Sequence, residues 1–415
     1  MFSPMIATII VLTSSVVMAA ETAKVLPKGI FRARVVGVQT EGISDRYNED
    51  GMLEGFSAGL NRTVTVQDLA AKDANVAKLV NALNGIQAGL GNQLMTANIY
   101  STFETQQRSW MPALEYGISE RTTIGVRVPI VRRFVQTDFW VDSNNQAYQT
   151  ALGLGAINPD VQAGLGTFGA TNFGTPFFAA KLFTDKGYEV PRDFDVTEFG
   201  DVELGAKFNF YKHSHWIVSM VGGLRIPTGS TAALNNIFDK GSGTGAWGIG
   251  AQFVEAYVPA SWVTLTAMQK MTYSFPDTRD RAVPKDENDT LPSLLPADGQ
   301  VQSVTRNQTA EIVTELSSTF YFDQETYSAW TAYQYGYKGH DRYTGAGNLY
   351  YAGLSKGTNW QKHTGELGVG YSTIPAFRKQ KFPVPGELQL LYNTLLDGQN
   401  VPLSSYVRMD FIAYF

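Results

Sequence analysis

The chain has 415 residues, a formal net charge of −5 and no cysteine. Only 17% of its residues are charged, against about 25% in a typical soluble domain, whereas tyrosine (20) and phenylalanine (24) are plentiful. The length allows one large barrel or two to three ordinary domains. The lack of cysteine excludes a disulfide framework and thiol chemistry, and the mildly acidic balance argues against a nucleic-acid-binding protein.

The first twenty residues resemble a secretory signal peptide. Two mostly apolar runs lie at Met5–Leu12 and Val16–Ala20, and the stretch Val17–Ala19 with the following Ala20 offers small residues that suit cleavage. No lysine or arginine precedes the first run, so an N-terminal membrane anchor is the alternative, although the run is short for a span of about 20 residues. We therefore expect a signal peptide at 1–20 and a single domain at 21–415.

Segments of alternating polarity recur along the rest of the chain, separated by connections that are short, then long, then short. Alternation of this kind predicts strands, and the loop rhythm is typical of a barrel with tight periplasmic turns. The predicted strands lie at about 28–38, 104–116, 122–135, 198–211, 216–227, 245–257, 262–275, 307–320, 327–337, 362–372, 387–395 and 406–415. The predicted long outer loops are 39–103, 137–197 and 276–306, and apolar residues at helical spacing place a helix near 66–90. The predicted fold class is all-β: a transmembrane antiparallel β-barrel of about 12 strands with long extracellular loops, one containing a helix.

The last strand shows the alternation most clearly. Val407, Met409 and Phe411 share an apolar face with Phe415, whereas Arg408 and Asp410 lie on the other face. A soluble sandwich could alternate too, but the export signal, the loop rhythm and aromatic residues at strand ends favour a membrane barrel. We expect the protein in the bacterial cell outer membrane, in contact with outer-membrane lipid and lipopolysaccharide. Phe415 is the expected assembly signal, through which the C-terminal strand contacts the barrel-assembly machinery.

Charged residues of both signs fall on the faces that alternation turns inward. They could line a water path for a small-molecule solute, or pair across the barrel and fill it. The predicted lumen-lining residues are Arg127, Asp201, Glu203, Lys207, Arg225, Glu311, Glu315, Glu366, Arg408 and Asp410.

Catalytic and metal-binding motifs are weak in this chain. The four histidines are His213, His215, His340 and His363, and none stands in a sequence pattern that supplies a nucleophile, a base and an orienting group. The pair His213 and His215 and the acidic run 286–289 are candidate cation ligands, but the run lacks EF-hand spacing. We predict no catalytic residue, no metal and no cofactor. The loop at 150–195 either packs on the barrel rim or folds inward with its aromatic residues, Phe168, Phe173, Phe177 and Phe178.

Two stretches resemble a known family. Glu115–Pro129 looks like the turn and strand of outer-membrane barrels of the MetA-pathway of phenol degradation family, and Phe199–Lys207 followed by Gly223–Gly229 is similar to its next hairpin. The resemblance is strongest over residues 113–230 and implies passage of hydrophobic or aromatic compounds. The predicted function is an outer-membrane channel for passive uptake of small, hydrophobic or aromatic solutes, and the protein is not expected to be an enzyme. The alternative is a structural or receptor-like surface protein with a filled barrel and partner-binding outer loops.

Overall fold

A computed structural model of the chain describes residues 22–59, 61–65, 74–93, 96–143, 187–236, 238–287 and 300–415, with the single residues 67, 70, 153, 159 and 184. The predicted signal peptide and the aromatic residues Phe168, Phe173, Phe177 and Phe178 lie outside the described residues.

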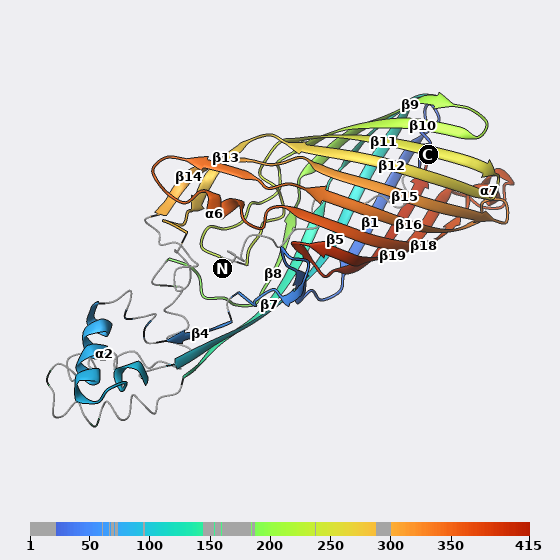
Figure 1. Cartoon of the computed structure of the whole chain (residues 1–415). Coiled ribbons are helices and arrows are strands. Elements are labelled where there is room, and N and C mark those ends of the chain that lie inside the picture. Colours follow the sequence, from blue (N-terminus) through green and yellow to red (C-terminus); the bar gives the residue numbers. More distant parts are fainter. Residues whose placement is uncertain are drawn as a thin grey trace.

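The described chain is almost entirely strand (Figure 1). The strands of the wall are β1 (Phe31–Thr40), β5 (Thr96–Ser119), β6 (Thr122–Arg127), β7 (Ile130–Ser143), β8 (Phe194–Phe199), β9 (Val202–Lys212), β10 (Trp216–Ile226), β11 (Gly248–Ala260), β12 (Val263–Ser274), β15 (Glu311–Phe322), β16 (Tyr327–Lys338), β18 (Trp360–Ser372), β19 (Gly386–Gln399) and β21 (Ser405–Tyr414). Shorter elements outside the wall are β2 (Asp45–Tyr47), β3 (Leu53–Gly55), β4 (Arg62–Thr65), β13 (Asp277–Ala282), β14 (Val301–Asn307), β17 (Arg342–Gly345), β20 (Val401–Pro402), α2 (Ala74–Ile86), η1 (Gly91–Gln93), α6 (Ala352–Ser355) and α7 (Ile374–Arg378).

The wall closes on itself. Every neighbouring pair is antiparallel, and β1 pairs with β21 on one side and with β5 on the other. β6 and β7 form one interrupted strand beside β5, and β8 and β9 form the next. The result is a closed barrel of 12 strands, which confirms the predicted fold class and strand number. Closure pairs the backbone groups along both sides of every strand, as a lipid environment requires.

The strands extend further into the predicted outer loops than alternation indicated. β5 begins at Thr96 and β7 continues to Ser143, so both intrude into the predicted loops 39–103 and 137–197. The predicted loop 276–306 contains β13 and most of β14. These extensions lie beyond the apolar wall of the barrel. A strand there no longer has one face toward lipid and the other toward the lumen, so the alternation of apolar and polar residues fades in the sequence.

The outer surface of the barrel is apolar, as predicted. On β21, Val407, Met409 and Phe411 are 40–52% exposed, whereas the alternate residues Arg408 and Asp410 are each 1% exposed. Aromatic rings gather near the short turns that join the strands at one end, where Trp and Tyr favour a membrane interface. These contacts are Phe31–Tyr116, Trp216–Tyr257, Trp262–Phe320 and Tyr327–Tyr371. Among the described residues, no helix is long and apolar enough to cross a membrane.

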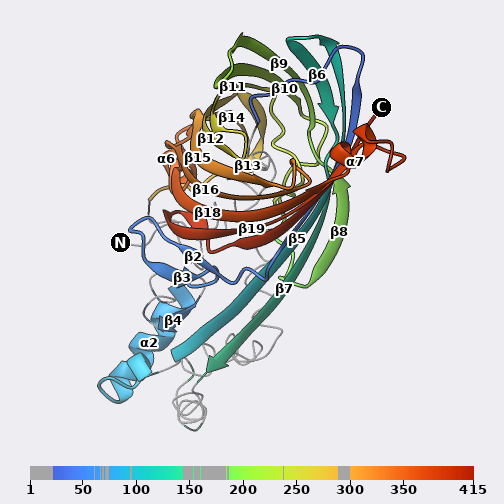
Figure 2. The same ribbon diagram turned by 90° about the vertical axis from the view of Figure 1, so that its right-hand side faces the viewer.

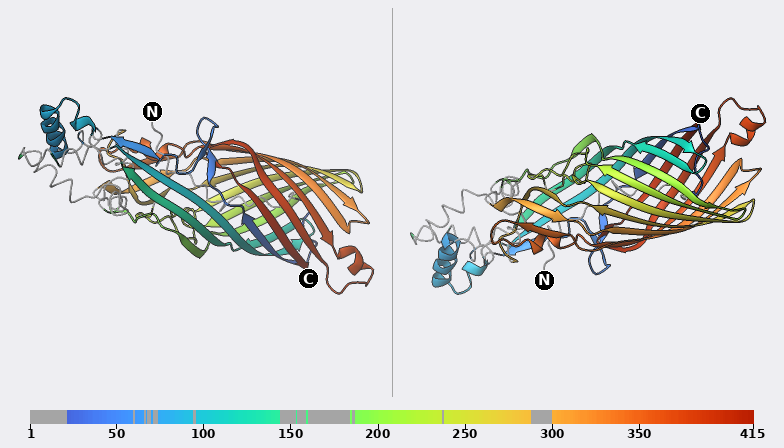
Figure 3. Two further views of the ribbon diagram at one scale, coloured as in Figure 1. Left: turned by 90° about the horizontal axis from the view of Figure 1, so that it is seen from below. Right: turned by 90° about the horizontal axis from the view of Figure 1, so that it is seen from above.

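Two structures project from the end of the barrel opposite these turns. The hairpin of β5 and β7 runs far beyond the barrel, with β4 paired to β5 and α2 beyond it (Figures 1 and 3). The helix predicted near 66–90 is thus observed over Ala74–Ile86, and it lies away from the lumen. The second structure is a small sheet of β13, β14 and β17, which lies beyond the ends of β12 and β15 in Figure 1 and behind the barrel wall in the end-on view of Figure 2.

Leu316 offers a test of the lipid-facing side. It lies near the middle of β15 and is 59% exposed. We expect Leu316→Arg to lower the free energy of unfolding from lipid vesicles by about 2–4 kcal/mol, the range for a basic side chain at the bilayer midplane. Denaturant titration measures the change, and Leu316→Ala is the control that removes the side chain without adding charge. Equal stability of L316R and L316A would contradict the assignment.

Candidate functional site: the barrel lumen

The wall is interrupted where β6 gives way to β7 and β8 to β9. Pro129 stands in the first interruption, and Gly200 and Asp201 in the second; the Gly200 amide donates to the Pro129 carbonyl at 2.8 Å. Proline has no amide hydrogen to give to a ladder, so a break is expected beside it. Both interruptions fall on neighbouring strands, and together they form one irregular patch in the wall.

The loop between β10 and β11, which we call the inward loop, folds against the inner side of this patch. Asp201 accepts hydrogen bonds from the Gly229 amide (3.0 Å), the Thr244 amide (2.8 Å) and the Thr244 hydroxyl (2.8 Å). The Ser242 hydroxyl donates to the Phe199 carbonyl at 2.6 Å. The loop therefore supplies partners for groups that the interrupted ladder leaves without strand neighbours.

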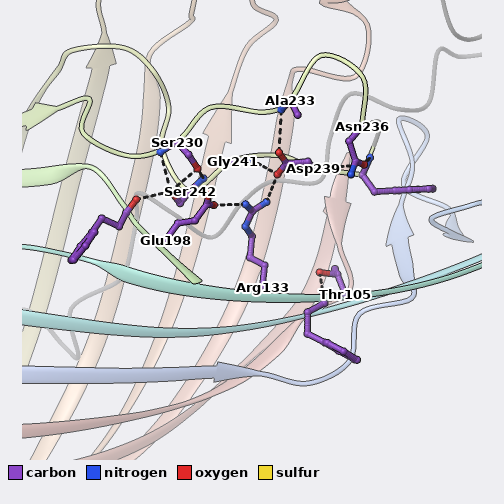
Figure 4. Close-up of polar contacts among 12 residues, drawn as sticks. Thr105, Arg133, Glu198, Ser230, Ala233, Asn236, Asp239, Gly241 and Ser242 are labelled. Atoms are coloured by element: carbon purple, nitrogen blue, oxygen red, sulfur yellow. Dashed lines mark hydrogen bonds and ion pairs between the residues drawn. The ribbon is translucent and has the colours of Figure 1, made fainter. Parts of the chain in front are cut away.

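Arg133 of β7 makes a second set of contacts with the same loop, separate from those of Asp201 (Figure 4). Its guanidinium pairs with Glu198 at 2.6 Å and with Asp239 of the loop at 2.9 Å. Burial alone would raise the pKa of Asp239, but hydrogen bonds from the Gly241 amide and Arg133 hold that pKa below its usual value. Asp239 thus stays ionised at neutral pH, and its ion pair with Arg133 holds the loop against β7.

Inside the barrel, charged side chains lie opposite one another on neighbouring strands. Arg127 of β6 faces Glu203 of β9 and forms an ion pair with it, and Glu203 in turn faces Arg225 of β10. Arg225 donates to the Ser274 hydroxyl at 2.6 Å and lies 3.9 Å from Asp201. Direct opposition of unlike charges stabilises a strand pair, so this row braces the wall beside the interruption.

A second charged group spans the seam between the first and last strands. Two of the three guanidinium nitrogens of Arg408, Nε and Nη2, donate to Asp410 at 2.8 and 2.7 Å, and Arg34 of β1 pairs with the same carboxylate. Arg408 and Asp410 side chains are each 1% exposed. The seam is therefore closed by side chains as well as by backbone hydrogen bonds.

The wall next to the seam is filled by large polar side chains. The Trp330 indole donates to Glu366 at 2.9 Å, and the Gln334 amide donates to Glu315 at 2.5 Å. Glu315 and Glu366 are 1% and 3% exposed. This part of the interior is packed and offers no room for a solute.

The opposite wall is lined by glycine. Four glycines face one another directly across β6, β9, β10 and β11 on the inward side: Gly125, Gly205, Gly223 and Gly250. A Cβ atom at the last three would come no closer than 3.6 Å to any atom outside its chain neighbours. A side chain at these positions would therefore extend into space, and glycine keeps that space open. We call these four residues the glycine strip.

The first described residues lie inside the barrel against the wall beside this strip. Lys207 donates to the Thr22 carbonyl at 2.8 Å, Ser219 donates to the Ala23 carbonyl, and the Leu26 amide donates to the Thr123 hydroxyl at 2.8 Å. Ala23 packs in a buried apolar cluster with Ile217, Val254, Ala256, Met268 and Val313. The segment narrows the lumen on one side of the glycine strip.

A cavity of about 200 Å³ remains between the glycine strip, the N-terminal segment and the seam. Its apolar lining includes Leu26, Val36, Met268 and Val313, which come from four different parts of the chain. Charged side chains complete the lining, among them Arg127, Glu203, Lys207 and Arg408. An apolar pocket with a few converging polar groups is the usual form of a small-molecule site, so we take this cavity as the candidate functional site.

The ten residues predicted from alternation fall on the inward side, but in different surroundings. Arg127, Glu203, Lys207 and Arg408 line the cavity. Asp201 binds the inward loop, and Arg225 belongs to the row of charged residues beside it. Glu311 lies opposite Lys338 of β16. The remaining three are buried in the packed wall: Glu315, Glu366 and Asp410. Contact of the first four with a passing solute stays a prediction.

Sequence reasoning missed several residues of the cavity. Arg32 and Arg34 lie on the first strand at alternate positions, so parity could have found them. The glycine strip could not be found in this way, because four glycines far apart in sequence meet only through the strand register.

The histidines form no catalytic arrangement in the described chain. His215 and His340 contact the backbone carbonyls of Val258 and Ser355, and His363 contacts the Tyr333 hydroxyl on the outer surface. Across the part of the chain that the structure describes, no group of three or more histidine, aspartate or glutamate residues could hold a metal ion.

Comparison with known proteins identifies the fold. No family model and no curated protein matches the chain. Among solved structures, the chain is similar to the COG4313 outer membrane channel from Pseudomonas putida F1, with a TM-score of 0.53 and 11% identity over 96% of this chain and 100% of that chain. This similarity extends over almost the whole chain and shows the same barrel fold, which the resemblance in the sequence implied.

Two other structures match with lower similarity. The Pseudomonas putida toluene transporter TodX has a TM-score of 0.32 and 8% identity, covering 94% of this chain and 89% of that chain. A Pseudomonas aeruginosa FadL homologue has a TM-score of 0.32 and 9% identity, covering 93% and 90%.

Asp410 tests the energetic role of the seam. Removal of its charge leaves Arg34 and Arg408 buried without the carboxylate between them, and breaking a buried pair costs about 3–5 kcal/mol. We expect Asp410→Asn to lower the free energy of unfolding by that amount, measured by denaturant titration in vesicles.

The matched control is Asp195→Asn. Asp195 pairs with Arg132 at 2.5 Å on the outside of the wall, where the two side chains are 39% and 51% exposed. Solvent screens such a pair, so this variant should unfold with the wild type. If D410N unfolds no earlier than D195N, the seam cluster contributes nothing to closure.

Proposed function

We propose that the protein is a channel of the bacterial outer membrane that takes up small solutes passively, with preference for solutes that carry an apolar or aromatic body. The observation that supports this most directly is the cavity over the glycine strip. It is of small-molecule size, it lies inside a closed barrel, and its floor is kept free of side chains by four glycines, three of which have open Cβ positions.

The packing of the interior is consistent with this function. Buried polar side chains fill the wall near the seam, whereas the glycine strip leaves space inside β6, β9, β10 and β11, so a solute would pass off-centre along these four strands. A barrel of eight strands is filled by its own side chains, and twelve strands enclose more space. Chemistry at a catalytic site is not needed for such a role.

A second candidate function is a receptor-like surface protein. The hairpin of β5 and β7, with β4 and α2, extends far from the barrel and presents a surface that a channel does not require (Figure 3). In that case the N-terminal segment would fill the lumen as a fixed part of the fold, and no solute would pass.

Two adjacent glycines on β10 allow a test that distinguishes blocking of the lumen from damage to the fold. Gly223 faces the cavity and Gly222 faces lipid, where a Cβ atom would meet no atom within 4 Å. We expect Gly223→Leu to lower single-channel conductance in planar bilayers several-fold because the side chain fills the cavity, and Gly222→Leu to leave conductance unchanged. Refolded fractions of both variants should match the wild type.

The same recordings decide between the two candidates. Removal of residues 22–26 should raise conductance, because that segment narrows the lumen. If neither the wild type nor the truncated protein conducts at any voltage, the channel proposal is wrong and the receptor-like function is favoured.

A further inference from the structure

The charges inside the barrel differ in sign from the charge of the whole chain. The net charge of the protein is −5. Among the described residues that line the cavity, seven are basic and two are acidic; the basic ones are Lys24, Arg32, Arg34, Arg127, Lys207, Lys270 and Arg408. The acidic charge of the chain therefore lies elsewhere, and the cavity is a basic site in an acidic protein.

The acids of the cavity do not offset this excess. Glu115 pairs with Arg32 and Glu203 pairs with Arg127. Asp410, which lies behind the lining, is shared by two arginines of the seam.

A second basic group lies at the end of the barrel from which the small sheet of β13, β14 and β17 projects; we call this end the outer mouth. On β13, Asp277, Arg279 and Arg281 are half-buried, whereas Thr278 and Asp280 between them are exposed. Arg306 of β14 is half-buried too. Arg279 and Arg306 share Asp277, at 3.0 and 2.8 Å, and both donate to the Thr244 carbonyl, at 3.1 and 2.7 Å. Arg281 stacks over the Tyr343 ring at 5.3 Å, and its Nε is buried without a hydrogen-bond partner.

Lys240 of the inward loop adds to this group, which we call the outer basic cluster: Lys240, Arg279, Arg281 and Arg306. Burial and the neighbouring Arg281 lower the pKa of Lys240 to about 8. Burial and the neighbouring Arg306 and Arg281 lower the pKa of Arg279 to about 10. Burial is the larger cause of both shifts, and repulsion between the neighbouring cations adds to it. Cations held close together at a partly buried position favour the approach of an anion.

Thr244 connects the outer basic cluster to the lumen. Its carbonyl accepts from Arg279 and Arg306, and its hydroxyl donates to Asp201, which lies 3.9 Å from Arg225. Arg225 is in the same row of the wall as Arg127, and Arg127 lines the cavity. Basic side chains thus follow one another from the mouth to the cavity.

We propose that the channel selects anionic amphipathic solutes, namely small organic carboxylates with an apolar body. This rests on the proposed function and names its substrate class. Guanidinium groups match carboxylates in geometry, and basic walls of low dielectric constant concentrate anions and exclude cations. The apolar part of such a solute fits the glycine strip and its neighbours Leu26, Val36 and Met268.

Benzoate and benzylammonium, which match in size and differ in charge, are the probes. The permeability of each relative to chloride and potassium follows from reversal potentials in planar bilayers with the full-length protein. For the wild type we expect benzoate to be favoured over benzylammonium by about tenfold or more, the lower end of what a charged cleft provides. In Arg281→Gln/Lys24→Gln this ratio should fall several-fold.

The control is Lys379→Gln, since Lys379 is exposed beside α7 at the opposite end and donates to Gln324. This variant should keep the wild-type ratio. Equal passage of the two probes, or a ratio that the double substitution leaves unchanged, overturns the proposal: the arginines then only brace the wall, and the channel function stands. Absence of any current, with the truncated protein as well, refutes the channel and this inference together.

Discussion

The structure depends on closure of one backbone ladder between β1 and β21. In lipid an open strand edge would leave a row of unpaired amides and carbonyls, each costing several kcal/mol. The first and last strands of the barrel must therefore meet in register, and nine residue pairs align them from Arg32 and Tyr414 to Thr40 and Tyr406. Arg34 reaches across that seam to Asp410, so the charges that look like pore lining in the sequence first serve to close the wall.

Closure at the seam makes the interior asymmetric. Large side chains such as Trp330 and Arg408 crowd the strands near the seam, and the space they occupy is not available to a solute. The opposite wall carries the glycine strip, which restores space where packing does not need side chains. The cavity lies off-centre for this reason. The barrel thus combines a wall filled by polar side chains near the seam with open space over the glycine strip.

Alternation along the sequence was enough to predict twelve strands and the inward side of residues such as Arg127, Glu203 and Asp410, because lipid and lumen impose a period of two. It could not tell Arg127, which lines the cavity, from Asp410, which is buried behind it. That difference depends on which strands face one another across the barrel. The glycine strip depends on register in the same way. Where strands extend past the barrel, as β5 does toward Thr96, the alternation of apolar and polar residues no longer marks them.

The interruption at Pro129 and Gly200 links the wall to the outer mouth. Because the ladder is broken there, Asp201 is free of strand partners and instead organises the inward loop through Thr244. The same Thr244 offers its carbonyl to Arg279 and Arg306 of the outer sheet. A local defect of the barrel thereby fixes the position of a loop, and the loop fixes the basic residues of the mouth above those of the lumen. The charge pattern along the path follows from the place where the strand ladder fails.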